Sequence, residues 1–208
     1  MKYLLIVITL LASIAFGQSI VPMYEKNIAL RIFDNGVTKP IEYQEVSRIE
    51  VGNDLITYLD TRENFCVYSN GVKTDLLPMI NQVKTGETSV VFNSGPITFM
   101  FKDGKKRVLT NFGAQFDVSD SLIVFVNTFE GAVYARYNEV NHLMYSYLGN
   151  MTGALGVLGE NTFVFRNVAD DYVLFNRGVF TTLLNTNYPI KIVAGLDVVA
   201  FNDPVSNT

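Results

Sequence analysis

Five acidic residues recur at one position of a repeating pattern, and they are the side chains best placed to do chemistry together. Each lies one or two residues after a Gly or Ser at the turn that opens a repeat: Asp54, Glu87, Asp120, Glu160 and Asp197. In a radial arrangement of the repeats, these carboxylates would share one face. Such a ring can bind a hard cation, and two carboxylates about 5 to 10 Å apart can cleave a glycosidic bond.

The alternative interpretation of the five acids is structural, because Asp and Glu next to Gly are common in solvated turns. We favour this interpretation. We predict no metal site and no cofactor, and we keep the five carboxylates as candidate ligand-binding residues.

A second candidate binding patch consists of tyrosines gathered in one short segment: Tyr134, Tyr137, Tyr145 and Tyr147. Aromatic rings can stack on sugar rings, and in this chain Tyr would have to do so because there is no Trp. The alternative is that these rings fill the space between sheets. The segment lies in the least regular repeat, which makes it our second choice for a binding patch.

Nucleophilic catalysis has little support in the sequence. A reactive thiol needs a partner that lowers its pKa, and a zinc or copper site needs several nitrogen or sulfur ligands. The chain has one cysteine, Cys66, and one histidine, His142. We predict that Cys66 is a buried strand residue. The sequence identifies no catalytic residue, so it leaves the enzyme question open while favouring a protein that is not an enzyme.

The elements that position these residues are short strands in an internal repeat. An aromatic residue two places before a turn recurs every 33 to 38 residues, at Phe33, Tyr68, Phe101, Tyr137 and Phe175. A second aromatic series runs in step with it every 33 to 40 residues, at Tyr58, Phe92, Phe125, Phe165 and Phe201. A fixed period in this range predicts an array of one supersecondary unit, because a single unit cannot bury its apolar face alone.

Each unit contains enough strands for one blade of a β-propeller. In the first complete copy, apolar runs at residues 55–60, 65–69 and 72–77 are separated by polar turns, including Asn70-Gly71. Such runs are typical of short strands joined by hairpins. Residues 47–51 can add a fourth strand. Four strands in about 35 residues fit a propeller blade.

We predict an all-β fold, a five-bladed β-propeller of short four-stranded blades. The complete repeats span residues 47–80, 81–113, 114–151 and 152–189. Half-repeats at residues 24–46 and 190–208 would together form the closing blade, which leaves no long edge strand unpaired. A five-unit β-stack with a different closure is the alternative.

Residues 51–71 and 158–178 carry a resemblance to a known group of proteins. The chain resembles the secreted bacterial β-propeller repeat proteins, whose blades contain roughly Val-Gly-Asp-Asn, a hydrophobic strand, Asp-Asn, and a second strand ending in an aromatic residue and Asn-Gly. The resemblance covers most of the mature chain and implies architecture without a particular activity. The third repeat departs from it, with Ser119-Asp120 in place of Gly and with Glu139 after Asn138.

The N-terminus predicts export. Lys2, the apolar run at residues 3–12 and the small residues that end at Gly17 are typical of a secretory signal peptide. We expect residues 1–17 to be removed and residues 18–208 to form a single repeat domain, secreted or periplasmic. Later segments fall short of the ~20 apolar residues of a membrane-spanning helix. A formal net charge of −4 without a basic stripe argues against nucleic acid as a partner.

These observations predict a secreted binding or interaction module that presents propeller-face loops to a glycan, peptide or protein partner. One alternative is a carbohydrate-active enzyme that uses the carboxylates of the repeat-opening turns. The other is a structural envelope component, which would self-associate through the chain's high apolar content, 49% of its residues.

Overall fold

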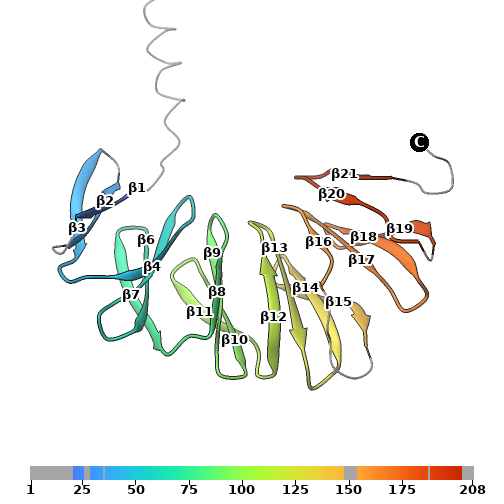
Figure 1. Cartoon of the computed structure of the whole chain (residues 1–208), viewed down its shortest axis with the longest axis horizontal. Helices are drawn as coiled ribbons and strands as arrows, with labels where there is room; N and C mark the ends of the chain where they lie inside the picture. Colours follow the sequence, from blue (N-terminus) through green and yellow to red (C-terminus); the bar gives the residue numbers. More distant parts are fainter. Residues whose placement is uncertain (1–20, 26–28, 35, 148–153, 187, 203–208) are drawn as a thin grey trace, which may run out of the picture. The chain divides into compact units, whose positions relative to one another are not determined.

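The fold consists of antiparallel β-sheets built from strands that follow one another in the chain (Figure 1). The computed structural model describes residues 21–25, 29–34, 36–147, 154–186 and 188–202. The chain divides into two compact units, one ending at Asp75 and the other beginning at Leu76. Across the described ranges, no helix has the length and apolar character needed to cross a membrane.

The first unit contains one three-stranded sheet and most of a four-stranded sheet. The three-stranded sheet has the order β1 (Val21–Glu25), β2 (Ala29–Asp34) and β3 (Val37–Glu42). The four-stranded sheet has the order β4 (Ser47–Val51), β5 (Leu55–Leu59), β6 (Asn64–Ser69) and β7 (Val72–Pro78), and β7 crosses into the second unit. Leu30 and Ile32 of β2 pack against Ile56 and Tyr58 of β5 in a buried core.

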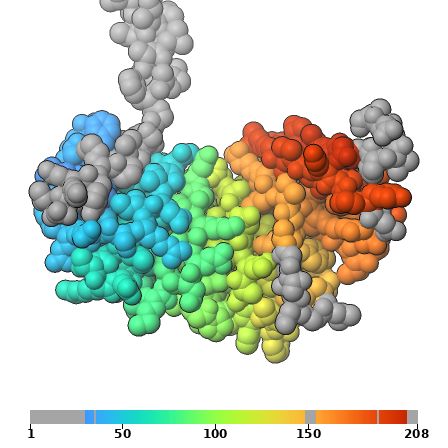
Figure 2. All heavy atoms as spheres, viewed as in Figure 1, coloured from blue at the N-terminus to red at the C-terminus, as the bar shows by residue number. Residues whose placement is uncertain are grey.

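The second unit contains three more four-stranded sheets, each paired in chain order. Their strands are β8 (Gln82–Thr85), β9 (Ser89–Ser94), β10 (Ile97–Lys102) and β11 (Lys105–Thr110); β12 (Gly113–Val118), β13 (Leu122–Asn127), β14 (Ala132–Tyr137) and β15 (Val140–Ser146); and β16 (Val157–Leu158), β17 (Thr162–Arg166), β18 (Asp171–Asn176) and β19 (Val179–Asn185). A final pair, β20 (Ile192–Ala194) and β21 (Val199–Phe201), lies beside the sheet β16–β19 (Figure 2).

Successive side chains of an inner strand point to opposite faces of its sheet, so they pack into two different cores. In β13, Val124 faces the sheet β16–β19 and packs with Phe163. The next residue, Phe125, faces the opposite way and packs with Val91 and Met100 of the sheet β8–β11. Strand β13 is therefore buried on both faces, which explains its uninterrupted apolar sequence.

The hairpin turn predicted at Asn70-Gly71 is confirmed, and the turn at Asp103-Gly104 has the same backbone geometry. Asn70 and Gly71 between β6 and β7 have φ angles of 51° and 80°, and Asp103 and Gly104 between β10 and β11 have 51° and 71°. Positive φ at both central residues defines the turn that suits the twist of a hairpin, and Asn-Gly and Asp-Gly adopt it readily.

The four-stranded antiparallel blades are confirmed, whereas the count of five and the closing blade are not. Among the described strands, β2 pairs with β1 and β3, and β21 pairs with β20. The sequence pattern missed β1, which occupies the edge of β2 that the closing blade would have used. A strand so near in the chain closes only a short loop, so its pairing costs little conformational entropy.

Gly113, at the start of β12, lies close to Thr98. A substitution at Gly113 therefore tests this packing. A Cβ at this position would overlap the buried hydroxyl of Thr98. We expect Gly113→Ala to lower the free energy of unfolding by about 2 kcal/mol, because overpacking forces neighbouring groups apart. Gly195→Ala is the control, since its Cβ would meet Val198 O at an ordinary 3.5 Å. Urea unfolding of both variants measures the difference, and equal losses would contradict the close approach.

Candidate functional site

A groove of about 400 Å³ in the second unit combines exposed aromatic rings with polar side chains. Its wall is formed by Phe112, just before β12, and by Phe129, in the turn between β13 and β14. The two rings stack, with centroids 5.0 Å apart and planes inclined by 26°. Phe112 is 46% exposed and Phe129 is 77% exposed. Stacking therefore holds both rings together while much of their surface faces solvent.

Hydrogen bonds donated by backbone N–H groups fix the two segments that carry these rings. Thr128 N donates to Phe112 O at 2.7 Å, and Phe112 N donates to Thr110 Oγ1 at 3.1 Å. Asn127 Oδ1 accepts hydrogen bonds from Phe129 N and Glu130 N at 3.1 and 3.3 Å. An Asn side chain that bonds the backbone two residues ahead stabilises a tight turn, so Phe129 sits on an ordered tip.

Tyr134 and Glu130 place a polar group beside the aromatic wall. The ring of Tyr134 stacks on Phe125 at 5.8 Å between centroids, and its hydroxyl donates to the Glu130 carboxylate. This hydrogen bond raises the pKa of Tyr134, so the phenol keeps its proton. The Glu130 carboxylate is thereby oriented, and it retains oxygen lone pairs that a ligand donor can approach.

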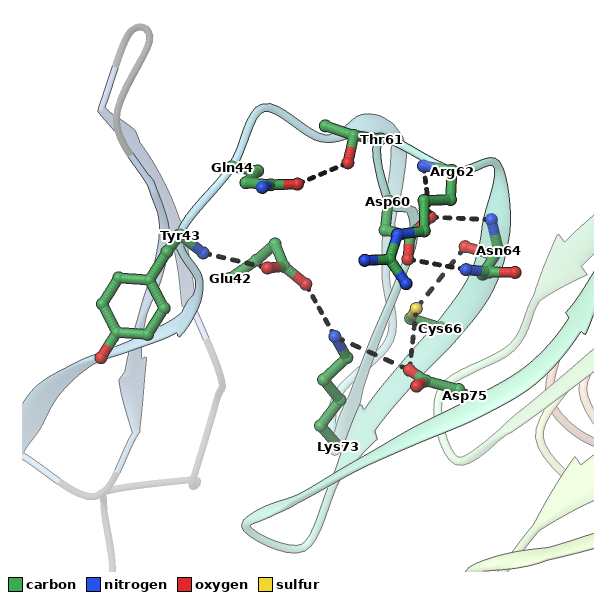
Figure 3. A network of polar contacts seen from close by, with 10 residues as sticks. All are labelled: Glu42, Tyr43, Gln44, Asp60, Thr61, Arg62, Asn64, Cys66, Lys73 and Asp75. Carbon is green, nitrogen blue, oxygen red and sulfur yellow. Dashed lines mark hydrogen bonds and ion pairs between the residues drawn. The ribbon is translucent and has the colours of Figure 1, made fainter.

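A second polar cluster lies in the first unit, around Lys73 (Figure 3). Lys73 Nζ is 2.7 Å from Glu42 Oε2 and 3.6 Å from Asp75 Oδ1. Cys66 Sγ donates to Asp75 Oδ1 at 3.2 Å. A polar cavity of about 320 Å³ is lined by Glu42, Lys73 and Asp75 together with the turn at Asp60.

The protonation states in this cluster leave it without a nucleophile at neutral pH. Burial and the hydrogen bond to Asp75 raise the pKa of Cys66 to about 12. Burial also raises the pKa of Tyr58, whose hydroxyl has no hydrogen-bond partner in the described part of the chain. Although burial opposes it, the hydrogen bond to Glu42 raises the pKa of Lys73. The thiol, phenol and amine all keep their protons, and Cys66 is buried as predicted.

The acidic turns of the second unit are linked to one another through hydrogen bonds. Glu87 N donates to Asp120 Oδ1 at 2.7 Å. Ser119 Oγ donates to Glu160 O at 2.7 Å. Asp197 accepts from Asn161 Nδ2 at 3.0 Å and pairs with Arg177 at 2.9 Å.

The structure thus brings four predicted acids into adjoining turns, where the carboxylates of Asp120 and Asp197 join one turn to another. Asp54 belongs to the other unit, where its side chain is exposed. In the described ranges, no three His, Cys, Asp or Glu side chains are grouped so that they could hold a metal ion.

The four predicted tyrosines fall into two groups. Tyr137, Tyr145 and Tyr147 pack against the core between β13 and β17. The ring of Tyr145 stacks on Phe165 at 5.5 Å, and burial raises its pKa to about 12. Tyr134 is the member of the predicted patch that lines the aromatic groove.

Sequence reasoning missed Phe112, Phe129 and Glu130. The sequence contained one signal. Phe129 lies in the turn between the second and third strands of its blade, and the equivalent position is Arg62 in one other repeat and Ala169 in another. An aromatic residue at the tip of a turn has no core to fill, so its presence there points to a contact outside the blade.

Comparisons with known proteins agree with the sheet architecture. A family model described as a 10-bladed beta propeller domain matches residues 14–208. No curated protein matches the chain in sequence.

Among solved structures, the fold is similar to that of human WBSCR16, with a TM-score of 0.45 and 10% identity over 89% of this chain and 70% of that one. It is similar to Kluyveromyces lactis Hsv2, with a TM-score of 0.46 and 12% identity over 84% of this chain and 62% of that one. It is also similar to the computationally designed Ika8 protein, with a TM-score of 0.40 and 11% identity over 86% of this chain and 65% of that one. The chain therefore spans less than two thirds of Hsv2 and of Ika8.

The buried thiol of Cys66 predicts a specific pH dependence of stability. From about pH 9 to 12 the unfolded chain loses the thiol proton while the folded chain keeps it, so the free energy of unfolding falls as pH rises. Cys66→Ala lacks this contribution, and its stability should fall less steeply, although Tyr58 still contributes in the same direction. Urea unfolding at pH 8, 9.5 and 10.5 compares the slopes.

Thiol labelling gives an independent check on Cys66. At pH 8 the native protein should react with a thiol reagent no faster than it unfolds, because a buried thiol with a raised pKa holds almost no thiolate. Rapid stoichiometric labelling of folded protein would show that Cys66 is accessible and contradict its placement.

Proposed function

Because the chain belongs to the 10-bladed β-propeller domain family, we propose that it is an exported binding module whose aromatic groove holds an apolar side chain of a partner protein. The propeller fold generally mediates protein interactions, and it places loops on a rigid β-scaffold. Export is supported by the signal-peptide pattern of residues 1–17.

The observation that carries this proposal is the exposed stack of Phe112 and Phe129. Protein interfaces are enriched in aromatic residues, with an apolar centre and a polar rim. Covering about 100 Å² of these rings would contribute about 2.5 kcal/mol at ~25 cal/mol per Å². Because the rings are already ordered by stacking and by the turn at Asn127, binding would cost little additional conformational entropy.

Glu130 supplies the directional contact of the proposed site. Its carboxylate lies beside the aromatic wall and is oriented by the hydroxyl of Tyr134. A hydrogen bond between an ionised group and its partner is about twice as strong as a neutral one. The preferred partner segment would therefore carry an apolar or aromatic anchor next to a Lys or Arg.

Selection from a displayed peptide library on the mature chain, residues 18–208, tests the proposal. We expect selected peptides to share an apolar anchor next to a basic residue and to bind Phe129→Ser at least about tenfold more weakly, a loss of ~1.4 kcal/mol. Glu130→Gln should weaken chiefly the peptides that carry the basic residue.

Val168→Ser is the matched control, because Val168 is 84% exposed in the corresponding turn of the next blade. Peptides that bind Phe129→Ser as tightly as the wild-type protein would place the contact elsewhere. An oligosaccharide panel is run in parallel; if only glycans bind, with Phe129→Ser abolishing their binding, the groove would serve a glycan partner instead.

A further inference from the structure

A polar cavity lies between the sheet β8–β11 and the sheet β12–β15 of the second unit. Its volume is about 240 Å³, and its lining includes Ser89 and Lys102 of the first sheet and Arg136 of the second. Met100 and Ile123, which belong to the core shared by these two sheets, also line it. The cavity thus combines charged and hydroxyl groups with an apolar wall.

Arg136 occupies a position that the other complete blades fill with a buried aromatic ring. Strand pairing identifies this position, because Arg136 pairs with Ile123 of β13 as Phe101 pairs with Val90 of β9. The equivalent residues of the other complete blades are at most 3% exposed: Tyr68, Phe101 and Phe175. The sequence spacing places Tyr137 in this series, whereas the pairing register assigns the place to Arg136. The third complete blade therefore has a cation where the others have a ring.

Neighbouring side chains hold the guanidinium of Arg136 in place. Its Nη1 donates to Asn141 Oδ1 at 2.9 Å, and its Nη2 donates to Glu139 Oε2 at 2.7 Å. The hydrogen bond from Arg136 lowers the pKa of Glu139, so the carboxylate stays charged. Arg136 Nε has no hydrogen-bond partner among the residues that the structure describes. One donor of a fixed guanidinium thus remains for a ligand.

Glu139 is a second departure from the repeat, at a turn position that favours glycine. Its φ angle is 67°, and the other complete blades have glycine with positive φ at this position: Gly71, Gly104 and Gly178. A non-glycine residue in this region is uncommon because its Cβ is crowded. The turn therefore accepts a less favourable backbone, and the side chain gained there orients Arg136.

Ser89 is a third departure, on the facing sheet. It begins β9, and the second strands of the other complete blades begin with Leu55, Leu122 and Thr162. Thr162 Oγ1 donates to Gly195 O at 3.2 Å. Ser89 is only 1% exposed, yet its hydroxyl has no hydrogen-bond partner within the described ranges. Because an unpaired buried hydroxyl is costly, Ser89 suits the wall of a site for a polar ligand better than a packed core.

The charges around the cavity indicate the class of ligand. Five charged residues line it, two cationic and three anionic: Lys102, Arg136, Asp103, Asp120 and Glu139. Arg107 pairs with Glu139 and balances the third carboxylate. A bare anion would be repelled by the carboxylates, and a bare cation by the ammonium and the guanidinium. A neutral ligand that both donates and accepts hydrogen bonds avoids both repulsions.

Sugar hydroxyls meet this requirement, because each can donate one hydrogen bond and accept two. The C–H groups of a sugar ring can also pack on apolar side chains such as Met100 and Ile123. The cavity is smaller than the about 300 to 1,000 Å³ of pockets that hold drug-sized ligands. Its size therefore suits a single sugar residue.

We infer that this cavity is a second binding site, which takes one sugar residue, either free or at the end of a glycan. Arg136 Nε and Ser89 Oγ donate to sugar oxygens, and Asp120, one of the five acids that the sequence predicts as ligand-binding residues, accepts from a sugar hydroxyl. The site lies at the opposite end of β13 from the aromatic groove, since Asp120 precedes this strand and Phe129 follows it. The inference is independent of the partner protein proposed for that groove.

An immobilised glycan panel and calorimetric titration test the inference on the mature chain, residues 18–208. We expect saturable binding of at least one sugar, with comparable affinity for the oligosaccharide and for its terminal monosaccharide. Arg136→Phe restores the residue type of the other blades and should weaken binding at least about tenfold, because a hydrogen bond from a charged group is lost. Ser89→Ala is a milder second variant with an effect in the same direction. Arg62→Phe is the matched control, because Arg62 is an exposed arginine in the turn between β5 and β6.

Several results would overturn the inference. One is the absence of sugar binding at millimolar concentration. Another is unchanged binding by both Arg136→Phe and Ser89→Ala, with circular dichroism showing that both variants are folded. Loss of sugar binding in Phe129→Ser but not in Arg136→Phe would assign the sugar to the aromatic groove. Sulfate or acetate that raises the melting temperature of the wild-type protein but not of Arg136→Phe, without any sugar binding, would show an anion site instead.

Discussion

The structure depends on one constraint: an inner strand such as β13 is apolar on both faces. In β13, Val124 and Phe125 are adjacent in sequence, yet they enter two different cores. A strand of this kind is stable only when a further sheet covers each face. Blades of the second unit therefore pack against one another, and hydrogen bonds between their repeat-opening turns link one blade to the next.

The same constraint separates the residues that the fold needs from those that it does not. Inner strands are filled by core residues, so the side chains that can contact a partner lie in turns and in the linkers between blades. The aromatic groove combines one residue of each kind, with Phe112 in a linker and Phe129 in a turn. Hydrogen bonds that Asn127 Oδ1 accepts and Thr128 N donates hold both residues on the scaffold. Since neither ring fills a core, burial within the blade does not account for them.

The strands, the hairpin turns and the burial of Cys66 could be predicted because each depends on local sequence. Alternation and Asn-Gly turns act over a few residues. The groove could not be predicted in this way, because Phe112 and Phe129 belong to different repeats and meet through tertiary packing. Tyr134 could be proposed from its aromatic ring. No sequence pattern pointed to Glu130, the hydrogen-bond partner that gives Tyr134 its role. β1 was not predicted because residues 21–25 contain no member of the two in-phase aromatic series.

The number of blades cannot be predicted from local sequence, and the reason is physical. Blade count is set by the angle between successive sheets, which is summed over every interface, whereas strand patterns report one sheet at a time. β1 is an edge strand that contains Pro22, and a proline in an edge strand limits indiscriminate pairing with other strands.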